Sequence, residues 1–242
     1  MHMFSMPAMP APLVRLLLVG VLAAIALVAA PTAATPAGKI VIYGADSGAT
    51  LTLHTKGSKI VVKGNMSKHG TQGCRFIRKH RAVCSTRRAN SIQINMGPSG
   101  DFVRVAEPLP VPLTIYLGAG SDKFIGSGEK DICFPGAARR NRCIGGGGND
   151  VCITGPRNSD CVGGRGDDYC RHGTGSDGCW GGRGNDVCIM GPGQDGCHGG
   201  PGRDRLYGGA QPDQLYGGRG RDFCDGQRGW GKSHSCDAGP RR

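Results

Sequence analysis

The sequence predicts an all-β protein whose strands coil into a parallel β-roll, a form of β-solenoid, preceded by an irregular N-terminal β segment. Three observations support this prediction. The pattern Gly-Gly-x-Gly-x-Asp occurs five times at intervals of 18 residues between positions 145 and 222. Looser copies fall halfway between, so the underlying period is nine residues. Two residues after each Asp stands a Cys or Leu, in the same phase throughout.

A nine-residue unit is too short for a helical repeat, but it suffices for a tight loop and a short strand. Glycine in the loop tolerates positive φ and close backbone approach. The x-U-x triplet that follows forms a strand with U, the Cys or Leu, pointing inward. Alternate units are expected to run along opposite sheets, so that two units make one coil and equivalent residues stack about 4.8 Å apart. One unit cannot bury its face alone, which is why the unit is repeated.

Stacking of the coils brings acidic side chains together. Like charges at this spacing repel and raise each other's pKa. A Ca²⁺ ion resolves the conflict, because it takes about 6–8 oxygen ligands and Asp carboxylates with backbone carbonyls supply them; Mg²⁺ fits less well because it demands a tighter octahedron. The predicted metal ligands are Asp150, Asp168, Asp186, Asp204 and Asp222 in a first column and Asp177, Asp195 and Asp213 in a second.

The second column is predicted to be the weaker one. Gln211 and Pro212 disturb its last loop, and Asn141 and Ser159 replace the acid at its start.

The motif Gly-Gly-x-Gly-x-Asp-x-U-x resembles the RTX, or hemolysin-type, calcium-binding repeat. The resemblance covers residues 118–224, about half of the chain. It implies a parallel β-roll with Ca²⁺ held in the turns between successive aspartates of a column. Three other interpretations of the glycine-rich sequence fit less well. A disordered segment would not keep Asp and Cys in a fixed phase, and collagen requires a period of three. A nucleotide-binding loop requires a strand before it and a helix after it.

An export signal is predicted at residues 1–34. Arg15 is followed by a continuous apolar run, residues 16–30, and then by small residues. This pattern is typical of a signal peptide, and the run is too short for a membrane span. We therefore expect the mature protein to be secreted, extracellular and without a membrane-spanning segment.

Residues 35–112 are predicted to form an N-terminal β region that leads into and caps the roll, because an open-ended array needs a cap. The roll itself is expected at residues 113–224, followed by a basic, glycine-rich tail at residues 225–242. Apolar and polar residues alternate in the N-terminal region as in half-buried strands. The predicted strands are 39–43, 50–54, 59–63 and 91–96 in this region and 113–117 at the start of the roll.

Twelve cysteines in an exported chain predict disulfides. Cys74 with Cys84 is expected to close a hairpin, and Cys224 with Cys236 to staple the end. Eight others occupy inward positions and can pair in two ways. Sequential neighbours can join across the core, as Cys152 with Cys161, or stacked neighbours can join within a sheet, as Cys152 with Cys170. Small Cys side chains let the sheets approach to the ~7 Å that a disulfide spans, which favours sequential pairs.

Two histidines near cysteines raise the question of a zinc site. His172 follows Cys170 and His198 follows Cys197, but closed zinc sites use Cys-x₂₋₄-Cys clusters, and no pair here has that spacing. Both histidines are expected to be exposed.

The net charge of +12 allows two interpretations. Much of it comes from Arg in the loops, which forms either a solvated face or a surface that attracts polyanions. Aromatic residues make up only 5%, which argues against stacking on nucleic-acid bases.

The sequence therefore predicts a secreted calcium-binding β-roll with a structural or adhesive role. No enzyme is expected, since neither His-Glu-x-x-His nor Gly-x-Ser-x-Gly occurs. The alternative is a disulfide-held basic β-solenoid that binds extracellular polyanions, such as a cell-wall polymer or polysaccharide, without calcium dependence.

Overall fold

The computed structural model describes residues 38–137, 140–227 and 232–237, and the predicted signal peptide lies outside them. The described residues form strands and no helix, so none of them offers a helix that could cross a membrane. The predicted all-β class and the parallel β-roll are confirmed.

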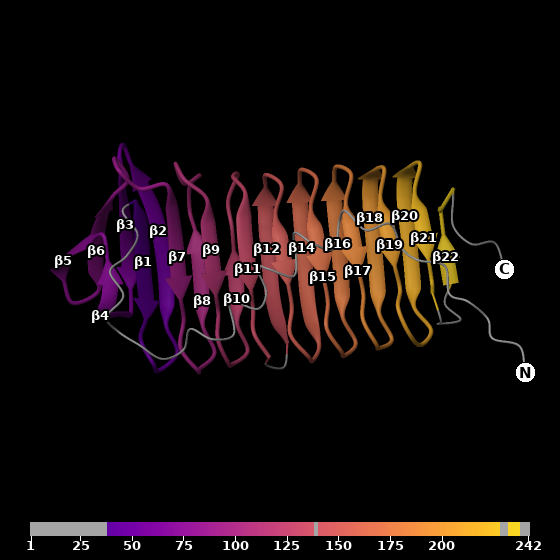
Figure 1. Cartoon of the computed structure of the whole chain (residues 1–242), viewed down its shortest axis with the longest axis horizontal. Coiled ribbons are helices and arrows are strands. Elements are labelled where there is room, and N and C mark those ends of the chain that lie inside the picture. Colours follow the sequence, from indigo (N-terminus) through magenta and orange to yellow (C-terminus); the bar gives the residue numbers. More distant parts are fainter. Residues whose placement is uncertain (1–37, 138–139, 228–231, 238–242) are drawn as a thin grey trace, which may run out of the picture. The chain divides into compact units, whose positions relative to one another are not determined.

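Two sheets face each other, and the chain alternates between them twice per coil (Figure 1). The ten-stranded sheet, sheet A, contains β1 (Lys39–Gly44), β4 (Met66–Gln72), β7 (Ser91–Asn95), β9 (Leu113–Tyr116), β11 (Asp131–Phe134), β13 (Val151–Ile153), β15 (Tyr169–Arg171), β17 (Val187–Ile189), β19 (Arg205–Tyr207) and β21 (Phe223–Asp225). The twelve-stranded sheet, sheet B, contains β2 (Thr50–Lys56), β3 (Lys59–Gly64), β5 (Cys74–Arg78), β6 (Arg81–Ser85), β8 (Phe102–Val105), β10 (Lys123–Ile125), β12 (Asn141–Gly147), β14 (Ser159–Arg165), β16 (Gly178–Arg183), β18 (Gly196–Gly202), β20 (Gln214–Gly220) and β22 (Lys232–His234).

The register of the parallel ladders follows the sequence period. Cys152 pairs with Cys170 in sheet A, and Cys161 pairs with Cys179 in sheet B, each 18 residues apart. Lys123 pairs with Arg142, 19 residues apart, because the loop before β12 carries one extra residue. The predicted stacking of residues one coil apart is therefore confirmed.

The parallel ladder begins earlier than the repeat motif does. β1 pairs in parallel with β7, and β2 with β8, so both sheets run unbroken across residues 112–113. β3, β4, β5 and β6 are antiparallel strands at the N-terminal end of the array. They lie within the region predicted as a cap. At the other end β22, within the segment predicted as a tail, adds one more strand to sheet B.

The interior changes in character along the array. The first coils bury branched aliphatic side chains such as Ile42, Leu51 and Ile94, whereas the later coils bury cysteines with Leu206 and Leu215. The cysteine coils are thin: the Cα atoms of Cys161 and Cys170, on opposite sheets, are 6.3 Å apart, against about 10 Å between ordinary packed sheets.

The disulfides join sequential neighbours, as predicted. The hairpin and terminal bonds are also confirmed. Cys152, however, is not bonded to Cys161; Cys152 and Cys197 are buried free thiols. The five bonds are Cys74–Cys84, Cys133–Cys143, Cys161–Cys170, Cys179–Cys188 and Cys224–Cys236.

Glycine is required where successive loops stack on one another. The third Gly of each strong copy has a positive φ, for example +122° at Gly166 and +139° at Gly184. A Cβ atom on Gly184 would overlap the carbonyl oxygen of Gly166 in the preceding coil. The loops therefore approach more closely than any side chain permits.

We expect Gly184→Ala to destabilise the roll by at least about 1–3 kcal/mol, because it adds backbone strain to a steric overlap. Urea denaturation of the calcium-free protein measures this loss. Gly196→Ala is the matched control, since a Cβ atom there meets nothing within 4 Å and Ala suits a strand better than Gly by about 0.5–1 kcal/mol. Equal destabilisation by both substitutions would contradict loop stacking.

Candidate metal centre

The aspartates of the strong copies form one buried column along the roll. Each backbone N–H donates to Oδ1 of the Asp one coil later: Asp150 to Asp168 at 2.7 Å, and Asp168 to Asp186 at 2.8 Å. Asp186 donates to Asp204 at 2.8 Å, and Asp204 to Asp222 at 2.9 Å. The structure therefore brings together all five residues predicted for the first column, and each is at most 6% exposed.

The second column has the same construction. The N–H of Ser159 donates to Oδ1 of Asp177 at 2.7 Å, and Asp177 donates to Asp195 at 2.8 Å. Asp195 donates in turn to Asp213 at 3.0 Å. All three predicted residues of this column are buried and in register.

Sequence reasoning missed three further members of these columns. Asp131 precedes Asp150 in the first column, with its N–H donating to Asp150 Oδ1 at 2.7 Å. Asp101 and Asp122 begin the second, joined by a 2.8 Å bond. The signal was present in the sequence, since each of the last two ends a glycine-containing loop, but these loops depart too far from the strong motif.

The second carboxylate oxygen is what makes these columns unusual. In every predicted ligand Oδ2 is buried and has no hydrogen-bond partner among the described residues. A buried acceptor without a donor is costly, and a buried unpaired charge is more so. Each coil therefore presents an oxygen that requires either a proton or a cation. The residues concerned are Asp150, Asp168, Asp177, Asp186, Asp195, Asp204, Asp213 and Asp222.

Burial raises the pKa of several of these carboxyl groups above the ordinary Asp value. The pKa of Asp150 is raised to about 8, mainly by desolvation and further by the neighbouring Asp131 and Asp168, against the hydrogen bond from the Asp131 N–H. Desolvation likewise raises the pKa of Asp186 to about 7 and that of Asp204 to about 6. Without a cation, part of the column therefore holds protons near neutral pH.

The first Gly of each strong copy leaves room beside this oxygen. A Cβ atom on Gly145 would overlap Oδ2 of Asp150, and a Cβ atom on Gly181 would overlap Oδ2 of Asp186. A side chain at these positions would therefore displace the carboxylate oxygen that is left free.

The equivalent position carries larger, buried residues in three loops of the second column, namely Thr154, His172 and Met190, whereas Gly208 occupies it before Asp213. His172 was expected to be exposed, and that prediction is wrong. The outward-facing residue after Cys170 is Arg171, whereas His172, one residue later, is buried at the start of the next loop. Its Nδ1 lies 3.3 Å from Thr154 Oγ1 and 3.9 Å from Asp177 Oδ1, and burial lowers the pKa of its imidazole to about 4. Three loops of the second column thus differ from the first column in the size of the residue beside the carboxylate, a difference not predicted from the sequence.

The donor set fits Ca²⁺. The free donors are hard carboxylate oxygens in pairs of successive coils, next to glycine-rich loops whose carbonyls lie against the neighbouring coil. Ca²⁺ prefers such all-oxygen, multi-ligand surroundings.

Comparison with known proteins points to the same ion. Residues 198–229 match the family of the RTX calcium-binding nonapeptide repeat (4 copies). Residues 198–229 carry RTX calcium-binding repeats. No curated protein matches the chain. The match spans the repeats whose inward residues are Leu206, Leu215 and Cys224, and in the repeats before it that position is Cys.

We expect the calcium-free β-roll to lose stability as pH rises from about 5 to 8. An unfolded Asp has a pKa of about 3.9, and the folded values reach about 6 to 8. The folded state therefore binds more protons in this window, so its extra stability is present at low pH and is lost as pH rises through the folded pKa values.

The measurement is the Tm in chelator at pH 5 and pH 8, with and without added Ca²⁺. Added Ca²⁺ should restore at pH 8 the stability that bound protons provide at pH 5. A Tm in chelator that increases with pH would argue against buried, unpaired carboxylates.

Proposed function

We propose that the chain is a secreted β-roll whose RTX array binds Ca²⁺ between successive coils and serves a structural or adhesive role without catalysis. The observation that carries this proposal is the row of buried Oδ2 oxygens without donors. In the first column, adjacent carboxylates such as those of Asp168 and Asp186 would hold an ion between them.

Binding of the ion is coupled to folding. When bound, Ca²⁺ supplies positive charge between carboxylates that otherwise repel. The protein's own part is to fix those carboxylates in register through their Oδ1 bonds, and an unfolded chain offers no such arrangement. Binding energy therefore becomes folding energy. Arg203 and Arg221 stand directly before ligand positions and oppose the ion's charge, so we expect an affinity of roughly 10⁻⁴–10⁻³ M, as in extracellular modules.

A substitution in the middle of the first column tests this function. We expect Asp186→Asn to abolish Ca²⁺ binding on both sides of residue 186, which isothermal calorimetry on the calcium-stripped chain reports as reduced stoichiometry. Asn keeps an Oδ1 acceptor for the Asp168 N–H, so the register is retained while the charge is lost.

Asp46→Asn is the control for net charge, because Asp46 is exposed and outside both columns. Unchanged stoichiometry and affinity in Asp186→Asn would refute an inter-coil site at this position.

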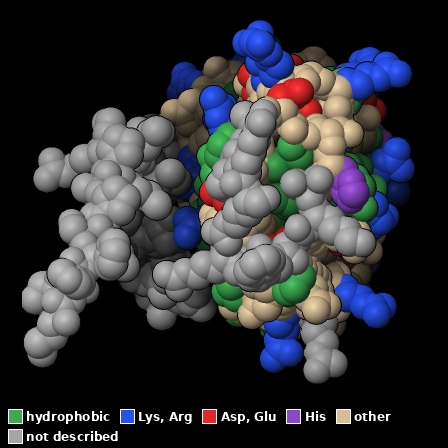
Figure 2. Space-filling view, turned by 90° about the vertical axis from the view of Figure 1, so that its right-hand side faces the viewer, with side chains coloured by type: hydrophobic (Ala, Val, Ile, Leu, Met, Phe, Trp, Pro, Cys, Tyr) green, Lys and Arg blue, Asp and Glu red, His purple; other side chains and the backbone are tan. Residues whose placement is uncertain are grey.

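The basic surface favours a second candidate, the binding of an anionic extracellular polymer. Arg165 and Arg183 lie side by side in the ladder, and Arg219 occupies the same position on β20, with Pro201 between. All three arginines are exposed. Lys and Arg side chains project on several sides of the face shown in Figure 2, where few acidic side chains are visible. A linear polyanion along the array would meet these arginines one after another.

We expect the triple change of Arg165, Arg183 and Arg219 to Gln to weaken salt-sensitive retention on an acidic polysaccharide, because three aligned charges are removed. Elution salt concentration is measured with Ca²⁺ and with chelator. The matched control removes three exposed arginines of the cap, Arg75, Arg78 and Arg81. If the cap variant loses as much retention as the β-roll variant, the attraction is due to net charge alone and this second candidate falls.

A further inference from the structure

Eight cysteines form a single column through the interior of the roll. They alternate between the sheets: Cys133, Cys152, Cys170 and Cys188 stack in sheet A, and Cys143, Cys161, Cys179 and Cys197 stack in sheet B. None is more than 5% exposed. Each inner member of this cysteine column therefore has two sequential neighbours on the opposite sheet.

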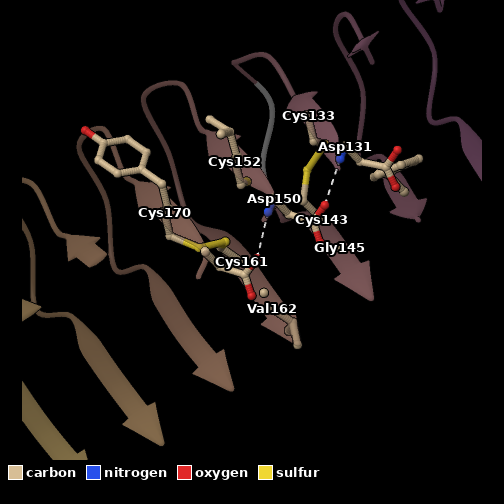
Figure 3. Close-up of a pocket in the computed structure, with 14 residues that line it drawn as sticks. Asp131, Cys133, Cys143, Gly145, Asp150, Cys152, Cys161, Val162 and Cys170 are labelled. Atoms are coloured by element: carbon tan, nitrogen blue, oxygen red, sulfur yellow. Dashed lines mark hydrogen bonds between the residues drawn. A yellow bond between two sulfur atoms is a disulfide. The ribbon is translucent and has the colours of Figure 1, made fainter. Parts of the chain in front are cut away.

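The bonds in the structure use only six of the eight. Cys133–Cys143, Cys161–Cys170 and Cys179–Cys188 are disulfides, while Cys152 and Cys197 keep free thiols. Figure 3 shows Cys152 between the first two of these bonds.

Both free thiols lie beside a disulfide. The sulfur atoms of Cys133, Cys143 and Cys152 all lie within 4.8 Å of one another. The same holds for Cys179, Cys188 and Cys197. A thiol at this distance needs only a small movement to reach the neighbouring bond.

Two directions of bridging already exist in the roll. Cys133–Cys143 joins sheet A to the next strand of sheet B, with Cα atoms 6.5 Å apart. Cys161–Cys170 and Cys179–Cys188 join sheet B to the next strand of sheet A, at 6.3 and 6.4 Å. Disulfides span Cα distances of about 4.4–6.8 Å. The backbone therefore accepts a bond in either direction, and the pairing is not fixed by geometry.

We propose that the cysteine column carries one further site of disulfide formation, reached by exchange along the column. The thiol of Cys197 attacks Cys188, forming Cys188–Cys197 and releasing the thiol of Cys179. Cys179 then attacks Cys170, forming Cys170–Cys179 and releasing the thiol of Cys161. These two steps only move bonds, so they consume no oxidant.

The last step is an oxidation. The thiols of Cys161 and Cys152 are then sequential neighbours, and a small-molecule disulfide accepts their two electrons and two protons, becoming two thiols. Cys152–Cys161 forms, and all eight cysteines are paired. Cys133–Cys143 keeps its bond throughout.

The environment of Cys152 makes this exchange possible but slow. A cavity of about 10 Å³ adjoins Cys152, Cys143 and Cys161 and leaves the sulfur atoms room to move. Cys152 and Cys197 are both buried, so an external oxidant does not reach them readily, and the pairing is expected to persist until the roll loosens. This proposal does not depend on calcium binding.

Tryptic mapping of the folded, purified chain tests the proposal, because cleavage separates the two pairings. Cys161, Cys170 and Cys179 fall on three different peptides, residues 158–165, 166–171 and 172–183, while Cys188 and Cys197 share residues 184–203. We expect the untreated chain to contain two free thiols and to link 158–165 with 166–171.

After oxidised glutathione, digestion at mildly acidic pH should show 158–165 linked to the Cys152 peptide and 166–171 linked to 172–183. The intact chain should lose two hydrogen atoms and retain no glutathione. A chain isolated with this complete pairing already formed would equally support the proposal.

Two variants define the alternatives. Cys152→Ser should keep one thiol under the same treatment, distributed over Cys197, Cys179 and Cys161, and Cys197→Ser should likewise keep one thiol, distributed over Cys152, Cys170 and Cys188, so that neither variant loses two hydrogen atoms. Glutathione adducts at Cys152 and Cys197 with the original bonds retained, bonds within one sheet, or no reaction of the folded chain would each overturn the proposal.

Discussion

One hydrogen bond, repeated in every coil, determines the rest of the structure: a backbone N–H donating to Oδ1 of the Asp one coil later. It ties neighbouring coils at their loops, where the sheet ladders end, and so fixes the register to 18 residues in the strong copies. Because a one-residue slip in a strand would turn inward residues outward, the same bond also keeps the cysteines and leucines inside.

Asn141 shows why an acid in this position implies an ion. It occupies a place in the second column, and its Oδ1 accepts the Asp122 N–H at 2.9 Å. Its Nδ2 donates to the carbonyl of Pro135 at 2.7 Å, so both ends of the amide are satisfied. An Asp offers the same first bond but leaves its second oxygen without a donor. An uncharged side chain is therefore sufficient to hold the register, and the charge of the eight predicted aspartates is not needed for it.

The sequence determined those parts of the fold that repeat. The nine-residue period sufficed to place Asp150 and Asp168 in one column and Cys152 and Cys170 in one ladder, because stacking converts a sequence interval directly into a contact. The sequence did not predict β4, and it predicted β5 and β6 only as a hairpin closed by Cys74 and Cys84, since the segment 66–85 is polar, short and without period. The thiols at Cys152 and Cys197 were not predictable either, because each core cysteine has equivalent neighbours before and after it, so spacing alone does not select a pairing.

At each end of the array the outermost coil has to be bonded without a further coil beside it, and the two ends do so by different means. At the N-terminal end, β3 and β4 pair antiparallel with β2 and β1, so the first coil is covered by strands that need no acidic loop. At the C-terminal end, Asp237 Oδ2 accepts the N–H of Asp222 at 3.1 Å.

Asp237 follows Asp222 by 15 residues instead of 18, so the segment between donor and acceptor is shorter than in the array. A terminal coil has a neighbour on one side only and opens most easily. The adjacent Cys224–Cys236 bond holds Asp237 near its donor without help from a further coil. The last bond of the column is therefore secured covalently at the point where stacking can no longer supply the constraint.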